Sequence, residues 1–380
     1  MSGSSKLTLR QKMVVALLPS LLLLLVAEGM VRFYYARAYG HSFFIFSTPK
    51  FDQQQMPEYH YAPRGQSWTT VDPCSKRTIV YTGNSQRARG KEWSLAKPKG
   101  TLRILAVGGS DTFGINSPDG ATWPAFLEAS LRRQGHQVEV FNGGWPRSRL
   151  MDVLHWYSTD WHRYKPDLVL CYLAYNDTWR GSASEVVANV LTLHNYTWAG
   201  RLTKWLYFRS MLYTYLLEKS QFWMVSRNAD AVVPDVRKFQ TELKNLVKMC
   251  RENGTTPVFV LQCNNSPQLK EVRNLDLEDT EKVRSFILEV LSNDRRTPLF
   301  DAMYPKKAKA AMLKLYQAQV LVEVLRRAGE TLGVQVIDPR QSVIGYKPPD
   351  DIFCDEIHLS DRGNRVLAEA IAEYLALPGA

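Results

Sequence analysis

The sequence predicts an α/β protein, a doubly wound three-layer sandwich in which helices cover both faces of a five-stranded parallel sheet. Three observations predict this class. Short apolar runs recur along the chain, segments with helical spacing separate them, and the runs are continuous rather than alternating, which is typical of strands buried on both faces. The chain of 380 residues is long enough to build such a core. The five runs are 102–108, 137–143, 167–174, 256–263 and 334–338.

Two of the intervening helices have clear patterns. Residues 236–250 carry apolar side chains at helical spacing, and Asn253 and Gly254 follow as a C-terminal stop. The last helix is expected to start after Ser360, a favourable N-cap residue, and to bury one face between residues 366 and 374. Helices that alternate with buried strands are what a doubly wound sheet requires.

The chain divides into parts of different composition. Two stretches, 178–234 and 264–333, interrupt the alternation of strands and helices and are too long for plain connections, so we expect helical insertions there. The expected parts are a cytoplasmic N-terminus over 1–12, a transmembrane helix over 13–31, an irregular lead-in over 32–100 and the α/β domain over 101–380.

Residues 13–31 form the longest apolar run in the sequence. At about 1.5 Å rise per residue, a helix of this length reaches across the hydrocarbon core of a bilayer. Lys6, Arg10 and Lys12 precede the run and no acidic residue does, which predicts a cytoplasmic N-terminus and an exported remainder. Ala36–Ala38 has the small-x-small form of a signal-peptidase site, so a cleaved signal peptide is the alternative. We expect a single-pass anchor that is retained.

Charge and cysteine usage exclude two classes of protein. The net charge is +11, yet the sequence has no block of lysine or arginine and no nucleic-acid motif, so we expect no nucleic-acid partner. A basic surface that faces anionic lipid or acidic glycan explains the charge equally well. The five cysteines lack the spacing of a zinc site, and we expect neither a metal nor a cofactor. An exported domain can hold up to two disulfides, and Cys171 lies in a strand pattern typical of the core.

The stretch "AVGGSDTFG", residues 106–114, places a serine between glycines directly after a predicted strand. A phosphate loop is excluded because Ile115 and Asn116 stand where lysine and serine or threonine belong. The dinucleotide pattern fails at Ser110, and the GxSxG elbow fails at Thr112, because each motif requires glycine there. A nucleophilic serine remains, provided that other strand ends supply a base and oxyanion donors.

Polar residues follow the other predicted strands at the points where such partners are required. Gly144 ends the second strand and lets backbone N–H groups approach a ligand, and Asn176 follows the third strand with a side-chain amide. Asp355 and His358 lie three residues apart just before the last helix, so the carboxylate can hold Nδ1 while Nε2 faces a nucleophile. Because the carboxyl ends of parallel strands meet at one edge of the sheet, these groups are expected to converge on Ser110.

Four blocks of the chain resemble those of the SGNH (GDSL-type) hydrolases, in the family's order. "GGSDTFG" resembles GDSxTxG, "NGG" the glycine of block two, "YND" the GxND block and "DEIH" the DxxH block. The match runs from about Tyr81 to the C-terminus, and the lead-in and apolar helix resemble those of membrane-anchored bacterial members. Gly109 replaces the usual aspartate of block one, and Ala174 replaces the glycine of block three.

The resemblance implies a flavodoxin-like fold and a role for each matched residue. Ser110 is the nucleophile, His358 the base and Asp355 the residue that orients it. The backbone amide of Ser110, Gly144 and the side chain of Asn176 complete an oxyanion hole.

The sequence therefore predicts a membrane-anchored, extracytoplasmic serine esterase or deacylase. It would hydrolyse O-acyl esters of a carbohydrate or lipid through an acyl-serine intermediate. Two alternatives stay open: an O-acyltransferase that modifies a cell-envelope glycan, and an inactive anchored scaffold, which only the loss of glycine at Ala174 supports. Cys354 is disfavoured as a rival nucleophile because no oxyanion motif accompanies it.

Overall fold

The structure is a computed structural model that describes residues 8–39, 67–71, 77–86, 88–178, 232–266, 268–292, 308–344 and 352–377, with single positions between 198 and 216. The chain forms two compact units. The anchor unit comprises Met1–Glu58 and Gly181–Arg227, and the sheet unit comprises Tyr59–Arg180 and Asn228–Ala380.

The sheet unit is built on a five-stranded parallel sheet in the order β4-β3-β5-β6-β7, which confirms the predicted fold class. The chain runs from β3 to β4 on one side and then returns to β5 on the other, so the winding reverses beside β3. Open α/β sheets bind their ligands at the carboxyl ends of the strands at such a point. The strands are β3 (Leu102–Gly108), β4 (Val138–Gly144), β5 (Leu168–Tyr172), β6 (Thr256–Val260) and β7 (Gln335–Ile337).

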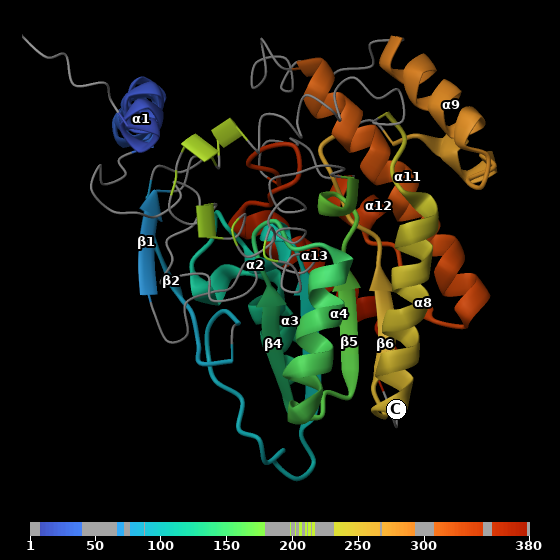
Figure 1. Ribbon diagram of the computed structural model, residues 1–380. Coiled ribbons are helices and arrows are strands. Elements are labelled where there is room, and N and C mark those ends of the chain that lie inside the picture. Colours follow the sequence, from blue (N-terminus) through green and yellow to red (C-terminus); the bar gives the residue numbers. More distant parts are fainter. Residues whose placement is uncertain are drawn as a thin grey trace, which may run out of the picture. The chain divides into compact units, whose positions relative to one another are not determined.

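Helices cover both faces of this sheet, with α4 and α8 in front of the strands in Figure 1. Successive residues of β3 show the three layers: Leu105 and Val107 pack in the core beneath α4, α8 and α11, whereas Ile104 and Ala106 pack with α3 and α13. The helices are α3 (Trp123–Arg133), α4 (Leu150–Thr159), α8 (Val236–Glu252), α9 (Thr280–Ser292), α11 (Ala308–Leu332), α12 (Arg340–Ile344) and α13 (Asp361–Tyr374). Short 3₁₀ turns lie at Asp119–Ala121, Trp161–Tyr164, Asn176–Thr178 and Lys270–Asn274.

The two helices with clear sequence patterns begin at side-chain caps. The Ser360 hydroxyl accepts a hydrogen bond from the Gly363 amide (3.1 Å), which starts α13 at the predicted place. The Asp235 carboxylate accepts one from the Lys238 amide (3.1 Å) at the start of α8. Each cap satisfies an amide that has no partner within its helix.

The lead-in is not irregular throughout, and the expectation over 32–100 was wrong for two short strands. β1 (Ser67–Val71) and β2 (Thr78–Thr82) pair antiparallel. Ile79 and Tyr81 are buried while their neighbours in β2 are exposed, so this strand has the alternation of a half-buried edge. Five residues are too few for that period to stand out from the polar sequence around them.

The anchor unit contains α1 (Leu9–Tyr39), a long helix that includes the predicted span over 13–31. Its window Leu17–Tyr34 has a mean hydropathy of 1.6, and it is the one helix in the described part of the chain that is long and apolar enough to cross a membrane. The leucines from Leu17 to Leu25 are exposed. Length and composition of this kind fit both a membrane span and a signal sequence.

The two expected insertions are described to different extents. Most of 178–234 lies outside the described residues, and its aromatic residues are therefore not discussed as a group. The stretch 264–333 contains α9 and α11, whose apolar faces extend the core on one side of the sheet.

Candidate active site

Ser110 begins α2 (Ser110–Phe113), a four-residue helix that directly follows β3. The turn into this helix needs glycine because the surrounding groups lie close to its backbone. A Cβ atom at Gly109 would lie 2.6 Å from the Asn176 side-chain nitrogen, and one at Gly108 would lie 2.6 Å from the carbonyl oxygen of Tyr172. Gly114 ends the helix with a φ of 78°, a left-handed conformation that favours glycine. The sequence therefore places Ser110 at the carboxyl end of β3.

The structure brings Ser110, His358 and Asp355 into one hydrogen-bonded row. Ser110 Oγ lies 2.6 Å from His358 Nε2, and His358 Nδ1 lies 2.5 Å from Asp355 Oδ2. The other carboxylate oxygen of Asp355 accepts hydrogen bonds from the backbone amides of Ile357 (3.0 Å) and His358 (2.7 Å). The loop before α13 thus fixes the carboxylate, and the carboxylate fixes the imidazole.

The electrostatics of the row suit a base at His358. Burial alone lowers the pKa of His358, but the hydrogen bond and charge of Asp355, with the charges of Asp111 and Glu356, outweigh it and raise the pKa above its ordinary value of 6.5. Burial alone raises the pKa of Asp355, but its bonds to His358 and Ile357 outweigh that effect and lower it. Asp355 therefore stays ionised while the imidazole gains affinity for a proton.

Asn176 lies beside the serine turn, at the start of a 3₁₀ turn (Asn176–Thr178) that follows β5. Its side-chain nitrogen donates to the carbonyl oxygen of Ser148 (2.9 Å) and lies against Gly109. The next residue, Asp177, accepts a hydrogen bond from the Leu150 amide (2.8 Å) at the start of α4, and burial raises the pKa of this carboxyl to about 7. Both side chains tie the end of β5 to the segment before α4. One amide hydrogen of Asn176 is left over for a ligand.

Gly144 is close to Ser110 but is engaged differently from the prediction. Its backbone amide, expected to serve as an oxyanion donor, donates to the side-chain oxygen of Asn142 (3.0 Å). A Cβ atom at Gly144 would lie 2.3 Å from the backbone nitrogen of Phe113. Gly144 therefore lets α2 pack on the end of β4, and we assign it this packing role. Sequence alone did not show that Asn142 would occupy the amide.

Two further polar residues support the site and were not singled out in the sequence. Gln262 donates from its side-chain nitrogen to Asp111 and accepts from the Tyr175 amide (2.7 Å) through its oxygen. It therefore joins the residue after Ser110 to the residue before Asn176. Burial raises the pKa of Asp111, although the hydrogen bond from Gln262 opposes this shift. The only feature of the sequence that could have indicated this role is that Gln262 directly follows the apolar residues of β6 and Leu261.

Neither Cys354 nor Cys171 competes with Ser110 as a nucleophile. Cys354 is disulfide-bonded, which removes it as a nucleophile. Cys171 is buried in the core, as predicted, and burial raises the pKa of its thiol far from the reactive range. Within the described residues, no group of three or more histidine, cysteine, aspartate and glutamate side chains is placed to hold a metal ion.

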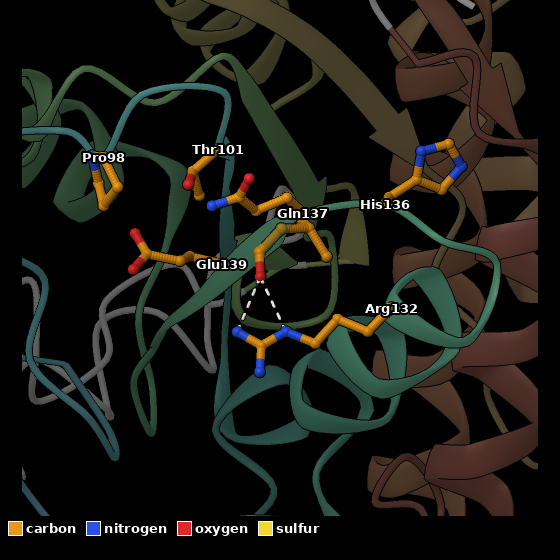
Figure 2. Close-up of a pocket in the computed structure, with 7 residues that line it drawn as sticks. Pro98, Thr101, Arg132, His136, Gln137 and Glu139 are labelled. Atoms are coloured by element: carbon orange, nitrogen blue, oxygen red, sulfur yellow. Dashed lines mark hydrogen bonds between the residues drawn. The ribbon is translucent and has the colours of Figure 1, made fainter.

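A hollow of about 350 Å³ lies at the opposite end of the sheet (Figure 2). Thr101 and Gln137, which precede β3 and β4, line it together with Arg132, whose guanidinium donates to the carbonyl oxygen of Val138 (3.1 and 3.0 Å). His136 also lines this hollow. The amino ends of parallel strands are not where α/β sheets hold their reactive groups. The hollow is therefore separate from the Ser110 site.

Comparisons with known proteins show a family to which the chain is similar. Residues 106–366 match the model of the GDSL-like lipase/acylhydrolase family. A lipase/acylhydrolase from Enterococcus faecalis has 16% identity and a TM-score of 0.40, with 72% of this chain and 94% of that chain covered. An acetylxylan esterase from Geobacillus stearothermophilus has 13% identity and a TM-score of 0.40, with 73% and 94% covered. No curated protein sequence matches the chain.

The family model begins in β3, four residues before Ser110, and extends through His358 into α13. It therefore spans both ends of the hydrogen-bonded row and more than half of the sequence. The sheet order and the position of the serine after β3 agree with the resemblance found in the sequence. The chain belongs to the GDSL-like lipase/acylhydrolase family.

Proposed function

We propose that the protein is a membrane-anchored serine esterase that hydrolyses O-acyl esters of a carbohydrate or lipid outside the cytoplasm. One observation carries the proposal: Ser110 Oγ lies 2.6 Å from His358 Nε2, whose ring is held from behind by Asp355. A serine hydroxyl is a weak nucleophile unless an adjacent base takes its proton. The hydrogen-bonded arrangement of Ser110, His358 and Asp355 therefore supports an active enzyme rather than an inactive scaffold.

The first half of the reaction forms an acyl-serine. Ser110 Oγ attacks the ester carbonyl carbon while its proton passes to His358 Nε2. Asp355 stabilises the imidazolium that results. The tetrahedral intermediate collapses when the bond from carbon to the alcohol oxygen breaks, and the leaving alkoxide takes the proton from His358. The second half repeats these steps with water as the nucleophile, which frees the carboxylic acid and restores Ser110.

The negative oxygen of the tetrahedral intermediate needs hydrogen-bond donors beside Ser110. The Ser110 amide is at the first position of α2, and the Asn176 side-chain nitrogen is held beside Gly109 by the carbonyl of Ser148. Each such donor contributes about 10²-fold or more to the rate. We assign both groups as oxyanion donors. We assign Gly144 only a role in the packing of α2, because its amide donates to Asn142.

Two features support an anchored protein whose sheet unit is exported. The exposed leucines of α1 follow a short basic N-terminus, the arrangement that keeps the N-terminus in the cytoplasm. Cys354 in the sheet unit is disulfide-bonded, and such bonds persist in oxidising compartments outside the cytoplasm.

Covalent labelling tests the proposed function. A fluorophosphonate probe should attach to Ser110 in the full-length chain in detergent, and Ser110→Ala should abolish the labelling while the protein stays folded. Mass spectrometry of the labelled peptide identifies the site, and circular dichroism checks the fold. A label on another residue, or equal labelling of Ser110→Ala, would contradict the proposal. Incubation of the acyl-enzyme with acceptor glycans then shows whether the acyl group passes to water or to sugar.

The pH dependence of hydrolysis follows from the raised pKa of His358. Only the neutral imidazole can take the serine proton, so kcat/KM should fall about tenfold per pH unit below that pKa. The midpoint of this acid limb should lie above pH 6.5. Asp355→Asn removes the largest effect that raises the pKa and leaves the effect of burial, so its acid limb should move to lower pH. Measuring kcat/KM for an aryl acetate between pH 4 and 9 checks both shifts, and an unmoved limb in Asp355→Asn would contradict the assignment.

A further inference from the structure

Glu28 is an ionisable residue inside the apolar window of α1. One of its carboxylate oxygens accepts a hydrogen bond from Arg32 Nε (2.7 Å), one helical turn further on, and the Arg32 side chain is only 8% exposed. Ionisable groups within membrane helices are costly, and they occur where a specific partner compensates them. The pair with Arg32 accounts for one of the two oxygens of Glu28.

The second oxygen of Glu28 binds a distant part of the same unit. It accepts hydrogen bonds from the Ser210 hydroxyl (2.7 Å) and from the Leu212 amide (2.9 Å). Ser210 Oγ in turn accepts from the Tyr213 amide (3.0 Å). Residues 212, 213, 215 and 216 are helical, so Ser210 and Glu28 together form the N-terminal cap of this helical segment. A carboxylate is favourable at that end of a helix.

This cap gives α1 a structural role that a removable signal peptide does not have. Without Glu28, the Leu212 amide would lose its acceptor at the start of a helix, where the backbone supplies none. In an apolar environment, an amide without a partner is strongly unfavourable, because no water replaces the lost acceptor. The contact joins residues 182 positions apart in the sequence, both in the anchor unit.

The anchor unit has exposed apolar side chains outside α1 as well. Trp198, Leu202 and Trp205 are described residues of this unit that precede Ser210, and each has helical backbone. Their side chains are 73%, 46% and 52% exposed, and Leu216 is also exposed. Tryptophan is enriched where a protein meets the interface of a bilayer. The same unit contains the exposed leucines of α1, so both segments present apolar surface in one body.

We propose that α1 is retained in the mature protein, where Glu28 holds Ser210 and Leu212 of the same unit, and that the exposed side chains of Trp198, Leu202, Trp205 and Leu216 contact the lipid bilayer. This inference rests on the proposed location of α1 in a membrane and is independent of the ester chemistry. We assign lipid as the partner of these side chains because they belong to the same compact unit as a helix whose composition fits a bilayer span.

The test uses the full-length chain in phosphatidylcholine vesicles that carry nitroxide groups on the acyl chains. A fluorophore that reports polarity is attached to Leu202→Cys, and the same label on Leu95→Cys is the control, because Leu95 is an exposed leucine of the sheet unit. Emission from residue 202 should shift to shorter wavelength and be quenched by the nitroxides, whereas emission from residue 95 should not. Intact mass of the purified chain should include residues 1–39.

Two variants test the cap. Glu28→Leu keeps α1 apolar and removes the acceptor, and Ser210→Ala removes the hydroxyl on the other side. Each should reduce the quenching at residue 202, and the double variant should behave like the single ones, because both break the same contact. Removal of α1 by proteolytic processing, equal quenching at residues 202 and 95, or unchanged quenching in Glu28→Leu would each overturn the inference. Fluorophosphonate labelling of Ser110 in the same samples reports separately on the proposed ester chemistry.

Discussion

Replacing His358 with alanine is expected to lower kcat/KM for hydrolysis of an aryl acetate by about 10⁴-fold or more. The variant removes the group that lies 2.6 Å from Ser110 Oγ and takes its proton. The hydroxyl alone is a poor nucleophile at neutral pH, so both halves of the reaction slow down. Steady-state kinetics on the full-length chain measure the loss, and denaturant unfolding checks that the variant is folded.

Two other substitutions show whether this loss is specific to the row of Ser110, His358 and Asp355. Asp355→Asn should lower the rate by about 10⁴-fold, because an amide in place of the carboxylate favours the wrong tautomer of the ring. His136→Ala is the matched control, since this exposed histidine lines the hollow at the other end of the sheet and should leave kcat/KM unchanged. A His358→Ala enzyme with activity near that of the wild type would rule out His358 as the base.

The fold was predictable because its determinants are local in the sequence. The continuous apolar run of β3 is buried on both faces, and glycines are required at its end because a Cβ atom there would lie within 3 Å of neighbouring atoms. The convergence of Ser110 and His358 followed from the rule that the carboxyl ends of parallel strands share one edge. The structure places the two side chains together, and their catalytic roles remain predictions until activity is measured.

The rest of the site depends on contacts that the sequence does not encode locally. The hydrogen bond from Gln262 to Asp111 joins residues 151 positions apart, and it requires the register of β3, β5 and β6 together with one rotamer of each side chain. The same holds for Asn142, whose side chain accepts a hydrogen bond from the amide that had been expected to face the oxyanion. A motif identifies the residue at such a position, but not which partner it binds.

Arg89 of the lead-in is the strongest case, because no pattern in the sequence indicates a role for it. Its guanidinium donates to the carbonyl oxygens of Phe113 (2.5 Å), Gly114 (2.7 Å) and Ser117 (2.5 Å) and pairs with Asp119 (2.7 Å). Burial lowers its pKa although the ion pair opposes this shift, and only 1% of the side chain is exposed. Phe113 and Gly114 end the helix that Ser110 begins, so Arg89 holds the far end of the nucleophile turn.

Arg89→Ala is expected to lower the free energy of unfolding by about 3 kcal/mol or more. The substitution removes three hydrogen bonds to backbone carbonyls and a cation that lies 4.6 Å from the ring centroid of Tyr81 and 4.7 Å from that of Phe113. Denaturant unfolding of the full-length chain measures this loss. Because α2 loses its restraint, the rate of fluorophosphonate labelling at Ser110 should fall as well.

Two matched arginine variants separate the geometry of Arg89 from its charge and from a general effect of removing arginine. Arg89→Lys keeps the charge but loses the planar fork that reaches several carbonyls at once, so it should restore only part of the stability and of the labelling rate. Arg163→Ala removes an exposed arginine whose ion pair with Asp160 spans 3.8 Å, and its effect should stay within about 0.5 kcal/mol. If Arg89→Lys had the full stability and labelling rate of the wild type, the charge alone would account for the role of Arg89. The idea that Arg89 positions α2 through hydrogen bonds to its carbonyls would then be wrong.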